Sequence, residues 1–478
     1  MAGCGLCRNS RAYGAWRLKR VLRGDIKRAR GKVNLSRRGC SRFTLLRMHL
    51  NLFIHGRGHH EAAWRHPLAS ELPLTDHRYY TELARTAEAG CLDSIFLADT
   101  LAVGDDVAHA PRTWLEPVTA LAALAMVTSR IGLIATCSTT YTEPFNLARQ
   151  FASVDHISGG RAGWNIVTTW LATASGNFGR EAPLAHAERY ERAEEYMRVV
   201  KGLWDCWADD AVLDDRAGGQ YAGPGGIRPV NHHGPHYHVA GPLNMPRCPQ
   251  GWPVFVQAGS SATGRRFAAR HAEAVFTAQM EKVTARDFYT DLKALALQEG
   301  RDPAHVLILP GLSPLIGSTE AEAQRLAREL NDLSDPEVGR KRLSGRFGGH
   351  DFSHLKLDEP LRVEDFPDPA TVEAARSRTE VIIGRREKPT LRQLLGYMAG
   401  ARGHFVTAGT PEMIADLMED WVRDGAADGF NLMPPILPAM LDVFVSQVVP
   451  LLRQRGLLRS EYDGTTLRDH YGLPRPRV

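Results

Sequence analysis

The chain has 478 residues, of which 43% are hydrophobic and 24% charged, and its formal net charge is +5. This composition is ordinary for a soluble globular protein of one large domain or two to three average ones. No apolar run approaches the ~18–20 residues that a bilayer span needs, and no apolar segment follows the basic N-terminus as in a signal peptide. We therefore expect a protein without a membrane partner.

The seven cysteines are odd in number and scattered along the chain. This arrangement does not suit a disulfide framework of the kind found in secreted proteins. We therefore expect a reducing compartment and a cytoplasmic location.

The charge is unevenly distributed along the chain. Residues 1–47 contain eleven Arg and three Lys against one acid, Asp25, so they carry about +13 and the rest about −8. They also lack sustained hydrophobic periodicity, which predicts disorder. A nucleic-acid-binding arm or an Arg-rich transit peptide fits this composition. We favour a third interpretation, in which translation starts at Met48, and we expect no nucleic-acid partner for the acidic remainder.

Buried strands and helices alternate from Met48 onward. The expected strands cover 48–54, 94–98, 131–136, 164–167, 253–258, 274–278, 306–316 and 429–433. The expected helices cover 76–89, 116–128, 146–155, 186–204, 262–271, 319–333, 411–424 and 440–455. Two stretches interrupt this order. Residues 209–252 are rich in Gly, Pro and His and predict a loop or short hairpin, whereas 334–398 predict a partly helical lid.

Eight buried strands alternating with helices predict an α/β fold, a (β/α)₈ TIM barrel with insertions, in a domain covering 48–478. A doubly wound sheet is the alternative. Gly56 and Gly58 resemble the start of a dinucleotide fingerprint, but Glu61 occupies the third glycine position. The segment therefore does not match a Rossmann dinucleotide-binding site, and this favours the barrel.

Polar side chains follow three of the expected strands. Asp99 ends the second strand, Thr136 and Ser138 end the third, and Asn165 and Thr168 lie in or after the fourth. Each one alone is explained by ordinary capping of a strand end. In a barrel, however, the carboxyl ends of all strands lie at one face, where ligands bind. Together these residues predict a ligand that needs hydrogen bonds.

A Gly- and Ser-rich turn joins the fifth strand to the next helix. Ser260 and Ser261 lie between Gly259 and Gly264, with Arg265 directly after. Hydroxyls and free backbone N–H groups at a helix N-terminus form a phosphate site. A plain serine N-cap explains the same residues equally well, although the flanking glycines favour close approach of a ligand.

His186 and Tyr190 are four residues apart on an expected helix and lie on the same face. Together they can reach one anionic or polar group. Because charged residues surround them, a solvated surface pair is the simpler interpretation when they are considered alone.

Several possible metal ligands cluster in the loop 209–252: His232, His233, His236, His238 and Cys248. Their spacing matches no strong zinc pattern, and Pro and Gly interrupt it. We therefore predict no metal site. The chain also contains neither a Gly-x-Ser-x-Gly elbow nor a P-loop.

Taken together, the segments resemble the bacterial luciferase-like flavin monooxygenases. The likeness is strongest to the subgroup of nitrilotriacetate monooxygenase component A and the dibenzothiophene-sulfone and EDTA monooxygenases. It is carried by residues 49–67, 94–99, 135–169, 186–196, 253–277, 406–418 and 428–435. The resemblance extends from Met48 nearly to the end and leaves out residues 1–47.

The resemblance implies a barrel that binds reduced FMN, FMNH₂, supplied by a separate NAD(P)H-dependent flavin reductase. The matching flavin-contacting positions are Asp99, Thr136, His186, Tyr190 and Ser261. Their expected neighbours in the cofactor site are Ser138, Asn165 and Ser260. A homodimer or homotetramer is also implied.

The implied activity is an O₂-dependent monooxygenation of a small organic molecule at a C–N or C–S bond. The cofactor carries this chemistry, and the barrel mouth must exclude water. His59 or His60 is the candidate proton donor, with His350 and His354 on the lid as weaker candidates. The alternatives are a deazaflavin-dependent oxidoreductase of the same fold and a non-catalytic flavin-binding protein.

Overall fold

Eight parallel strands form a closed barrel in the computed structural model, which describes residues 47–104, 107–169, 171–367, 388–401 and 403–477. The strands are β1 (His49–Ile54), β2 (Ser94–Leu97), β3 (Gly132–Ser138), β4 (Ala162–Val167), β9 (Val254–Gln257), β10 (Ala274–Thr277), β11 (Leu307–Ile316) and β13 (Gly429–Leu432). Neighbours pair in the order β1-β2-β3-β4-β9-β10-β11-β13, and β13 pairs with β1. The predicted (β/α)₈ barrel is confirmed, and the doubly wound alternative is wrong. The predicted extension lies outside the described residues, except for Arg47.

Apolar side chains fill the middle of the barrel. Phe53, Phe96 and Phe276 come from three different strands, and their ring centroids lie 4.6–5.9 Å apart. Ile134 and Met433 belong to the same cluster. Alternate strand residues point inward, which is why strands with two buried faces read as continuous apolar runs. This layer forms an apolar floor under the carboxyl ends of the strands.

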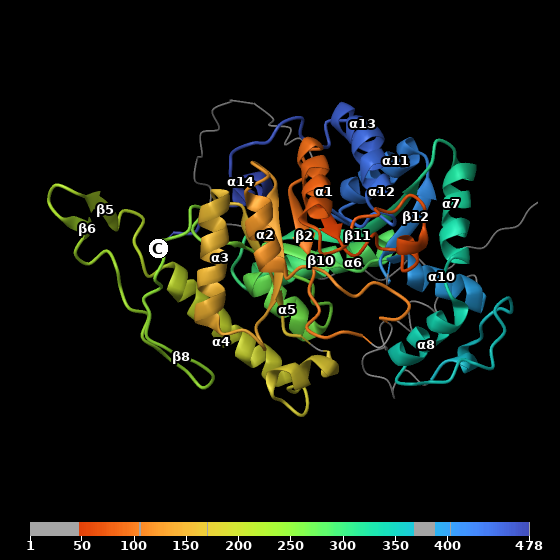
Figure 1. Cartoon of the computed structure of the whole chain (residues 1–478), viewed down its shortest axis with the longest axis horizontal. Helices are drawn as coiled ribbons and strands as arrows, with labels where there is room; N and C mark the ends of the chain where they lie inside the picture. Colours follow the sequence, from red (N-terminus) through yellow and green to blue (C-terminus); the bar gives the residue numbers. More distant parts are fainter. Residues whose placement is uncertain (1–46, 105–106, 170, 368–387, 402, 478) are drawn as a thin grey trace, which may run out of the picture. The chain divides into compact units, whose positions relative to one another are not determined.

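Helices cover the outside of the barrel. They are α1 (His77–Ala89), α2 (Pro117–Ala125), α3 (Pro144–Ser158), α4 (His186–Trp204), α5 (Ala262–His271), α6 (Lys282–Gln298), α7 (Glu320–Asp332) and α11 (Pro411–Arg423). Helices α2, α3 and α4 lie side by side (Figure 1). Trp164 of β4 and Trp204 of α4 are buried against each other, with ring centroids 6.4 Å apart. The apolar faces predicted from periodicity therefore pack on the barrel.

Strand β11 belongs only partly to the barrel. Its first residues pair with β10, whereas Leu312–Ile316 pair with a parallel strand β12 (Phe405–Gly409). The sequence analysis predicted 306–316 as one barrel strand and did not predict β12. The extension forms because the inserted segment returns to the sheet before β13 begins.

The described part of the insertion contains helices and its own small core. Helices α8 (Pro336–Arg346) and α10 (Leu391–Ala401) pack through an apolar cluster that includes Leu343, Phe347 and Leu394. Residues 368–387, in the middle of the predicted lid, lie outside the described residues. The described part of the insertion is therefore partly helical, as predicted. That the insertion covers the site stays a prediction.

The last long helix is interrupted, which corrects the prediction of one helix over 440–455. Helix α12 (Ala439–Val443) leads through a π-helical turn (Phe444–Val448) into α13 (Val449–Gln454). Pro450 lies at the start of α13, where its missing N–H leaves a regular α-helical ladder incomplete.

A short helix, α14 (Leu467–Tyr471), closes the amino-terminal end of the barrel. The Tyr471 hydroxyl donates to Asn51 Oδ1 at 2.7 Å. Leu467 packs so closely that a Cβ built on Gly132 would lie 2.4 Å from one of its methyl groups. Bulky residues of the C-terminal segment therefore fill this end, and the open end is the carboxyl one.

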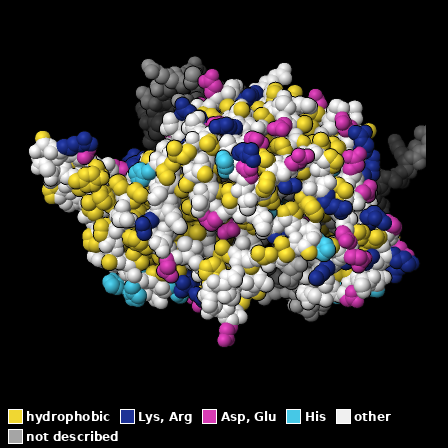
Figure 2. All heavy atoms as spheres, viewed as in Figure 1, with side chains coloured by type: hydrophobic (Ala, Val, Ile, Leu, Met, Phe, Trp, Pro, Cys, Tyr) yellow, Lys and Arg dark blue, Asp and Glu magenta, His cyan; other side chains and the backbone are white. Residues whose placement is uncertain are grey.

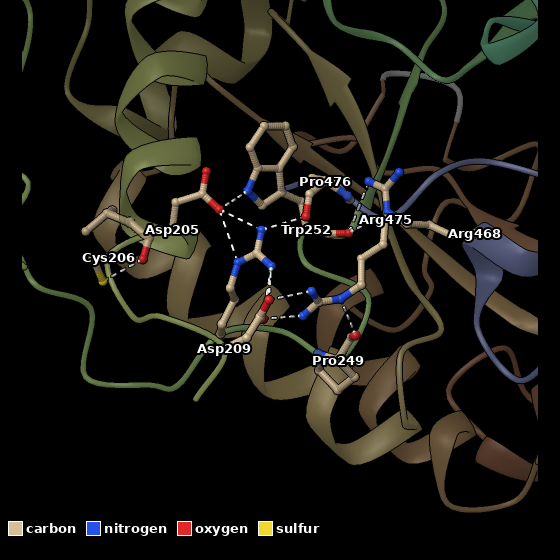
Figure 3. Close-up of polar contacts among 10 residues, drawn as sticks. Asp205, Cys206, Asp209, Pro249, Trp252, Arg468, Arg475 and Pro476 are labelled. Carbon is tan, nitrogen blue, oxygen red and sulfur yellow. Dashed lines mark hydrogen bonds and ion pairs between the residues drawn. The ribbon is translucent and has the colours of Figure 1, made fainter. Parts of the chain in front are cut away.

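Arginines anchor the C-terminal tail beside α4 (Figure 3). Arg475 donates to Asp209 at 2.8 Å, and Arg247 donates to both Asp209 and Asp205 at 3.0 Å. The Trp252 indole N–H donates to Asp205 at 2.8 Å. This network holds the tail against the segment that leads into two hairpins.

The stretch 209–252 forms the short hairpins that its composition allowed. They are β5 (Val212–Asp215) with β6 (Gln220–Ala222), and β7 (His232–His233) with β8 (His238–Val239).

Acidic and basic side chains are interspersed on the face shown in Figure 2. This distribution differs from the continuous basic face that is typical of nucleic-acid binding. Among the described helices, none combines the length and the apolar content needed to cross a bilayer.

Candidate functional site

Asn165 and Thr136 form a buried polar pair where β3 and β4 approach the open end of the barrel. The two residues are in register, and Asn165 Nδ2 donates to Thr136 Oγ1 at 2.9 Å. Both are less than 5% exposed, and within the described chain Asn165 Oδ1 has no hydrogen-bond donor. Leaving a buried amide oxygen unpaired is costly. This oxygen is therefore suited to accept a hydrogen bond from a ligand.

Ser138 supports the turn that follows β4. Its hydroxyl oxygen accepts from Thr169 Oγ1 at 2.7 Å and from the Thr140 N–H at 3.2 Å. Thr140 Oγ1 in turn donates to the Thr168 carbonyl at 2.8 Å. Thr169 has a φ of +41°, an unusual conformation for a β-branched residue. The predicted cofactor neighbour Ser138 therefore also has a structural role, which sequence reasoning missed.

The turn after β9 presents Ser260 and Ser261 at the N-terminus of α5. Ser261 is the N-cap and accepts from the Gly264 N–H at 3.0 Å. A Cβ on Gly259 would lie 2.9 Å from the Gly264 Cα, so this tight turn requires glycine. Both serines are exposed. The first turn of α5 therefore offers accessible N–H groups and hydroxyls, as an anion site requires.

The first turn of α4 lies beside this N-terminus. The rings of His186 and Tyr190 are in contact, with centroids 5.0 Å apart and planes tilted by 50°, as their spacing predicted. Burial raises the pKa of Tyr190, while hydrogen bonds to Ser261 and Thr168 act in the opposite direction. A Cβ on Gly264 would lie 2.9 Å from the Tyr190 hydroxyl. Residues distant in sequence thus converge at one helix N-terminus.

Asp99 follows β2 and is partly buried. It accepts from the Thr100 N–H at 2.8 Å and from the Trp114 side chain. Burial raises the pKa of Asp99, and these two hydrogen bonds partly offset that effect. Trp114 also packs on His55, with ring centroids 5.5 Å apart. The sequence analysis did not identify Trp114, because its contact with Asp99 depends on the path of the loop after β2.

The two candidate catalytic histidines have different surroundings. His59 is buried beside Phe53, with ring centroids 4.5 Å apart and Nε2 2.9 Å from the Phe53 carbonyl oxygen. His60 accepts from the Ala62 N–H at 3.2 Å, and its Nε2 lies 3.2 Å from Asn331 Oδ1. Burial lowers the pKa of His60 to about 4, so it is neutral near pH 7. His60 therefore joins the loop after β1 to α7, whereas His59 contacts the barrel interior.

The lid histidines lie in the described part of the insertion. His350 Nε2 is 3.1 Å from the Asp365 carbonyl oxygen, and its ring packs on Phe352 at 4.8 Å. These contacts stabilise the insertion itself. His354 lies in the same segment, in the turn that follows Phe352.

The histidine-rich hairpin is held by a carboxylate from α4. His232 Nε2 lies 2.9 Å from Glu195 Oε1, and the Tyr237 N–H donates to the same oxygen at 2.9 Å. Burial raises the pKa of Glu195, but these hydrogen bonds outweigh it, so the net pKa lies below its usual range. Within the described ranges, no three His, Cys, Asp or Glu side chains gather as metal ligands. Glu195 therefore joins the hairpin to α4 through His232 and Tyr237.

A cavity of about 500 Å³ lies between the insertion and the loop after β1. Arg65, Asn331 and Arg392 are among its lining residues, as are Glu61 and Arg342, which form an ion pair. None of the predicted cofactor residues lines this cavity. It is therefore distinct from the group formed by α4, α5 and β4.

Comparisons with known proteins support an enzyme family. The profile of the luciferase-like monooxygenases, Bac_luciferase, matches residues 48–428. N-acetyl-S-(2-succino)cysteine monooxygenase of Bacillus subtilis (strain 168) is 48% identical, over 89% of this chain and 97% of that protein. Nitrilotriacetate monooxygenase component A of Aminobacter aminovorans is 46% identical, over 90% and 97%. The solved structure of EDTA monooxygenase from Chelativorans sp. BNC1 is 37% identical with a TM-score of 0.77, over 90% of this chain and 99% of that chain.

Proposed function

Because the chain belongs to the luciferase-like monooxygenase family and is a flavin-dependent monooxygenase, we propose that it binds reduced FMN at the barrel mouth. We further propose that it oxidises a small organic molecule at a C–N or C–S bond. The substrates named for the Bacillus subtilis and Aminobacter aminovorans relatives carry carboxylates beside such bonds. Carboxylate-bearing thioethers and amines are therefore the first candidates for this chain.

The residues at the mouth fit the groups of reduced FMN. The observation that carries the proposal is the convergence of Tyr190 and Ser261 at the N-terminus of α5. Its exposed N–H groups suit a phosphate dianion, and the phenol of Tyr190 and the imidazole of His186 can donate to the same group. Asn165 Oδ1, which is buried, can accept from an N–H of the ring system.

When bound, reduced FMN supplies the two electrons with which O₂ gives one oxygen atom to the substrate and one to water. The protein residues orient the reactants and exclude water. Thr136 and Asn165 are almost fully buried, so bulk water has little access to this pair. His59, in the loop after β1, packs on Phe53 of the barrel interior and is the candidate for holding a proton near the reacting oxygen.

The resemblance to the family supports two expectations about assembly. We propose that a separate NAD(P)H-dependent flavin reductase delivers the cofactor, in the cytoplasm, and that the chain forms a homodimer or homotetramer. Light scattering of the purified protein measures the second point, and a monomer at micromolar concentration would contradict it.

The cofactor site is tested by anaerobic titration with reduced FMN. We expect Ser261→Ala and Tyr190→Phe each to weaken binding by about 1 kcal/mol or more, roughly fivefold, because each removes a charge-assisted hydrogen bond. Thr410→Ala removes the N-cap of α11 and Tyr221→Phe changes an exposed tyrosine, so both are matched controls. Unchanged affinity in the first two variants would contradict the placement.

The activity is tested with NADH and a general flavin reductase. Aminopolycarboxylates, thioethers and sulfones are screened for product that forms only with O₂. Absence of both product and reduced-FMN binding would refute the proposed function.

A further inference from the structure

His404 of the insertion lies at the rim of the barrel. It directly precedes β12, and the next residue, Phe405, pairs with Leu312 of β11. The parallel pairing of β11 with β12 fixes the backbone at this point. The insertion therefore contributes a side chain to the barrel, in addition to any role as a cover.

The imidazole of His404 occupies a space that β11 leaves open. A Cβ built on Gly311 would lie 2.4 Å from His404 Nδ1 and 2.6 Å from Met433 Sδ. One face of the imidazole stacks on Phe276, with centroids 4.6 Å apart and planes 1° from parallel. Glycine at 311 and an aromatic partner at 276 thus hold His404 against the floor of the mouth, while its side chain remains partly exposed.

His404 lies opposite the predicted flavin-binding residues. In the closed order of eight strands, β11 is four strands from β3 in either direction. Thr136 of β3 and Asn165 of β4 therefore face the β11 side across the mouth. A molecule bound between a flavin on β3 and β4 and the opposite wall would meet His404.

Other imidazoles are connected to His404 through phenylalanine rings of the barrel interior. His59 contacts Phe53, and Phe53 contacts Phe276 at 5.5 Å, so a continuous row of rings leads from His59 to His404. His55 extends the row, 5.6 Å from His59. Imidazoles supply N–H donors, and they can bind carboxylates.

We propose that His404 is a substrate-binding residue that donates a hydrogen bond to a carboxylate of the substrate. This inference rests on the proposed function and assigns a substrate class to the β11 side of the same mouth. The stack on Phe276 and the opening at Gly311 set the orientation of the imidazole, so that its position does not depend on the substrate.

The test compares two variants of His404 in the full-length protein loaded with FMN. His404→Phe keeps the aromatic stack and removes both nitrogens, whereas His404→Gln keeps an N–H donor. His77→Phe, at a histidine whose side chain is 76% exposed on α1, is the control. Calorimetry measures binding of nitrilotriacetate and of N-acetyl-S-(2-succino)cysteine, and a separate titration measures binding of FMN.

We expect His404→Phe to weaken binding of the better carboxylate probe at least tenfold and to raise its KM more than it lowers kcat. FMN affinity should stay within twofold, and His404→Gln should recover most of the loss. Equal probe affinity in His404→Phe and wild type would overturn the inference, as would a tenfold loss of FMN affinity. Wild-type protein that binds FMN but neither probe would refute only the carboxylate assignment, whereas absent FMN binding would refute the proposed function.

Discussion

The buried ion pair between Asp93 and Arg459 stabilises the closed end of the barrel, and Arg459→Met measures its contribution. Both side chains are 0% exposed. Asp93 contacts Arg459 and His49 through Oδ1 and accepts the Leu50 N–H through Oδ2 at 2.7 Å. Burial by itself raises the pKa of Asp93, but Arg459 and the other partners outweigh it, so the net pKa lies below its usual value.

Removing the cation leaves a buried carboxylate with weaker compensation. Breaking a buried pair in this way costs about 3–5 kcal/mol, because the remaining charge is desolvated. Total stabilities of natural proteins are about 5–15 kcal/mol, so the loss is a large fraction. We therefore expect Arg459→Met to unfold at clearly lower urea concentration than wild type near pH 7.5.

The loss should depend on pH with a defined sign. In the wild type, Asp93 has a depressed pKa, so its stabilising contribution is present above its unfolded pKa of about 3.9 and is lost as pH falls through the folded value. In Arg459→Met, burial dominates and the Asp93 pKa rises. The difference between the two proteins should therefore be largest near pH 7.5 and shrink as pH falls toward about 4.5, because Asp93 of the variant becomes protonated.

Urea denaturation followed by tryptophan fluorescence measures this at both pH values. Arg325→Met removes an arginine that is 58% exposed in α7 and should cost less than about 0.5 kcal/mol. Asp93→Asn should recover part of the loss in the Arg459→Met background, because it removes the unpaired charge. A loss below about 1 kcal/mol, or a loss that is the same at both pH values, would refute the reasoning.

Two further predictions concern stability. Gly58 has a φ of +136°, and a Cβ there would lie 2.2 Å from the Pro435 carbonyl oxygen, so Gly58→Ala should cost about 3 kcal/mol or more. Circular dichroism melting measures this; Gly176→Ala, at a position with open space, is the control, and equal midpoints for both would contradict it. Trp164 is fully buried and donates to the Cys137 carbonyl at 3.0 Å. Trp164→Ala should cost about 3–5 kcal/mol, with a smaller cost for Trp164→Phe, and the same melting curves would show the opposite order if the packing argument is wrong.

The sequence alone predicted the strands and much of the candidate site. Each barrel strand is a short apolar run bounded by turn residues, and this signal is local. The i, i+4 spacing of His186 and Tyr190 and the serine N-cap at Ser261 are also local, and the structure places all three together. Their role in binding FMN stays a prediction until the titrations are done.

Interactions between distant parts of the chain could be decided only by the tertiary structure. Among the described strands, the partly exposed β12 pairs only with the extension of β11, so its sequence lacks the pattern of a buried strand. The contact between Asp93 and Arg459 spans 366 positions, and the place of His404 depends on the absent side chain of Gly311. Periodicity reports which face of an element is apolar within about a dozen residues. Which elements then meet depends on closure of the barrel. Closure places the group at the start of α5 (Ser261, His186 and Tyr190) and the imidazole of His404 beside β11 at the carboxyl end of the same barrel.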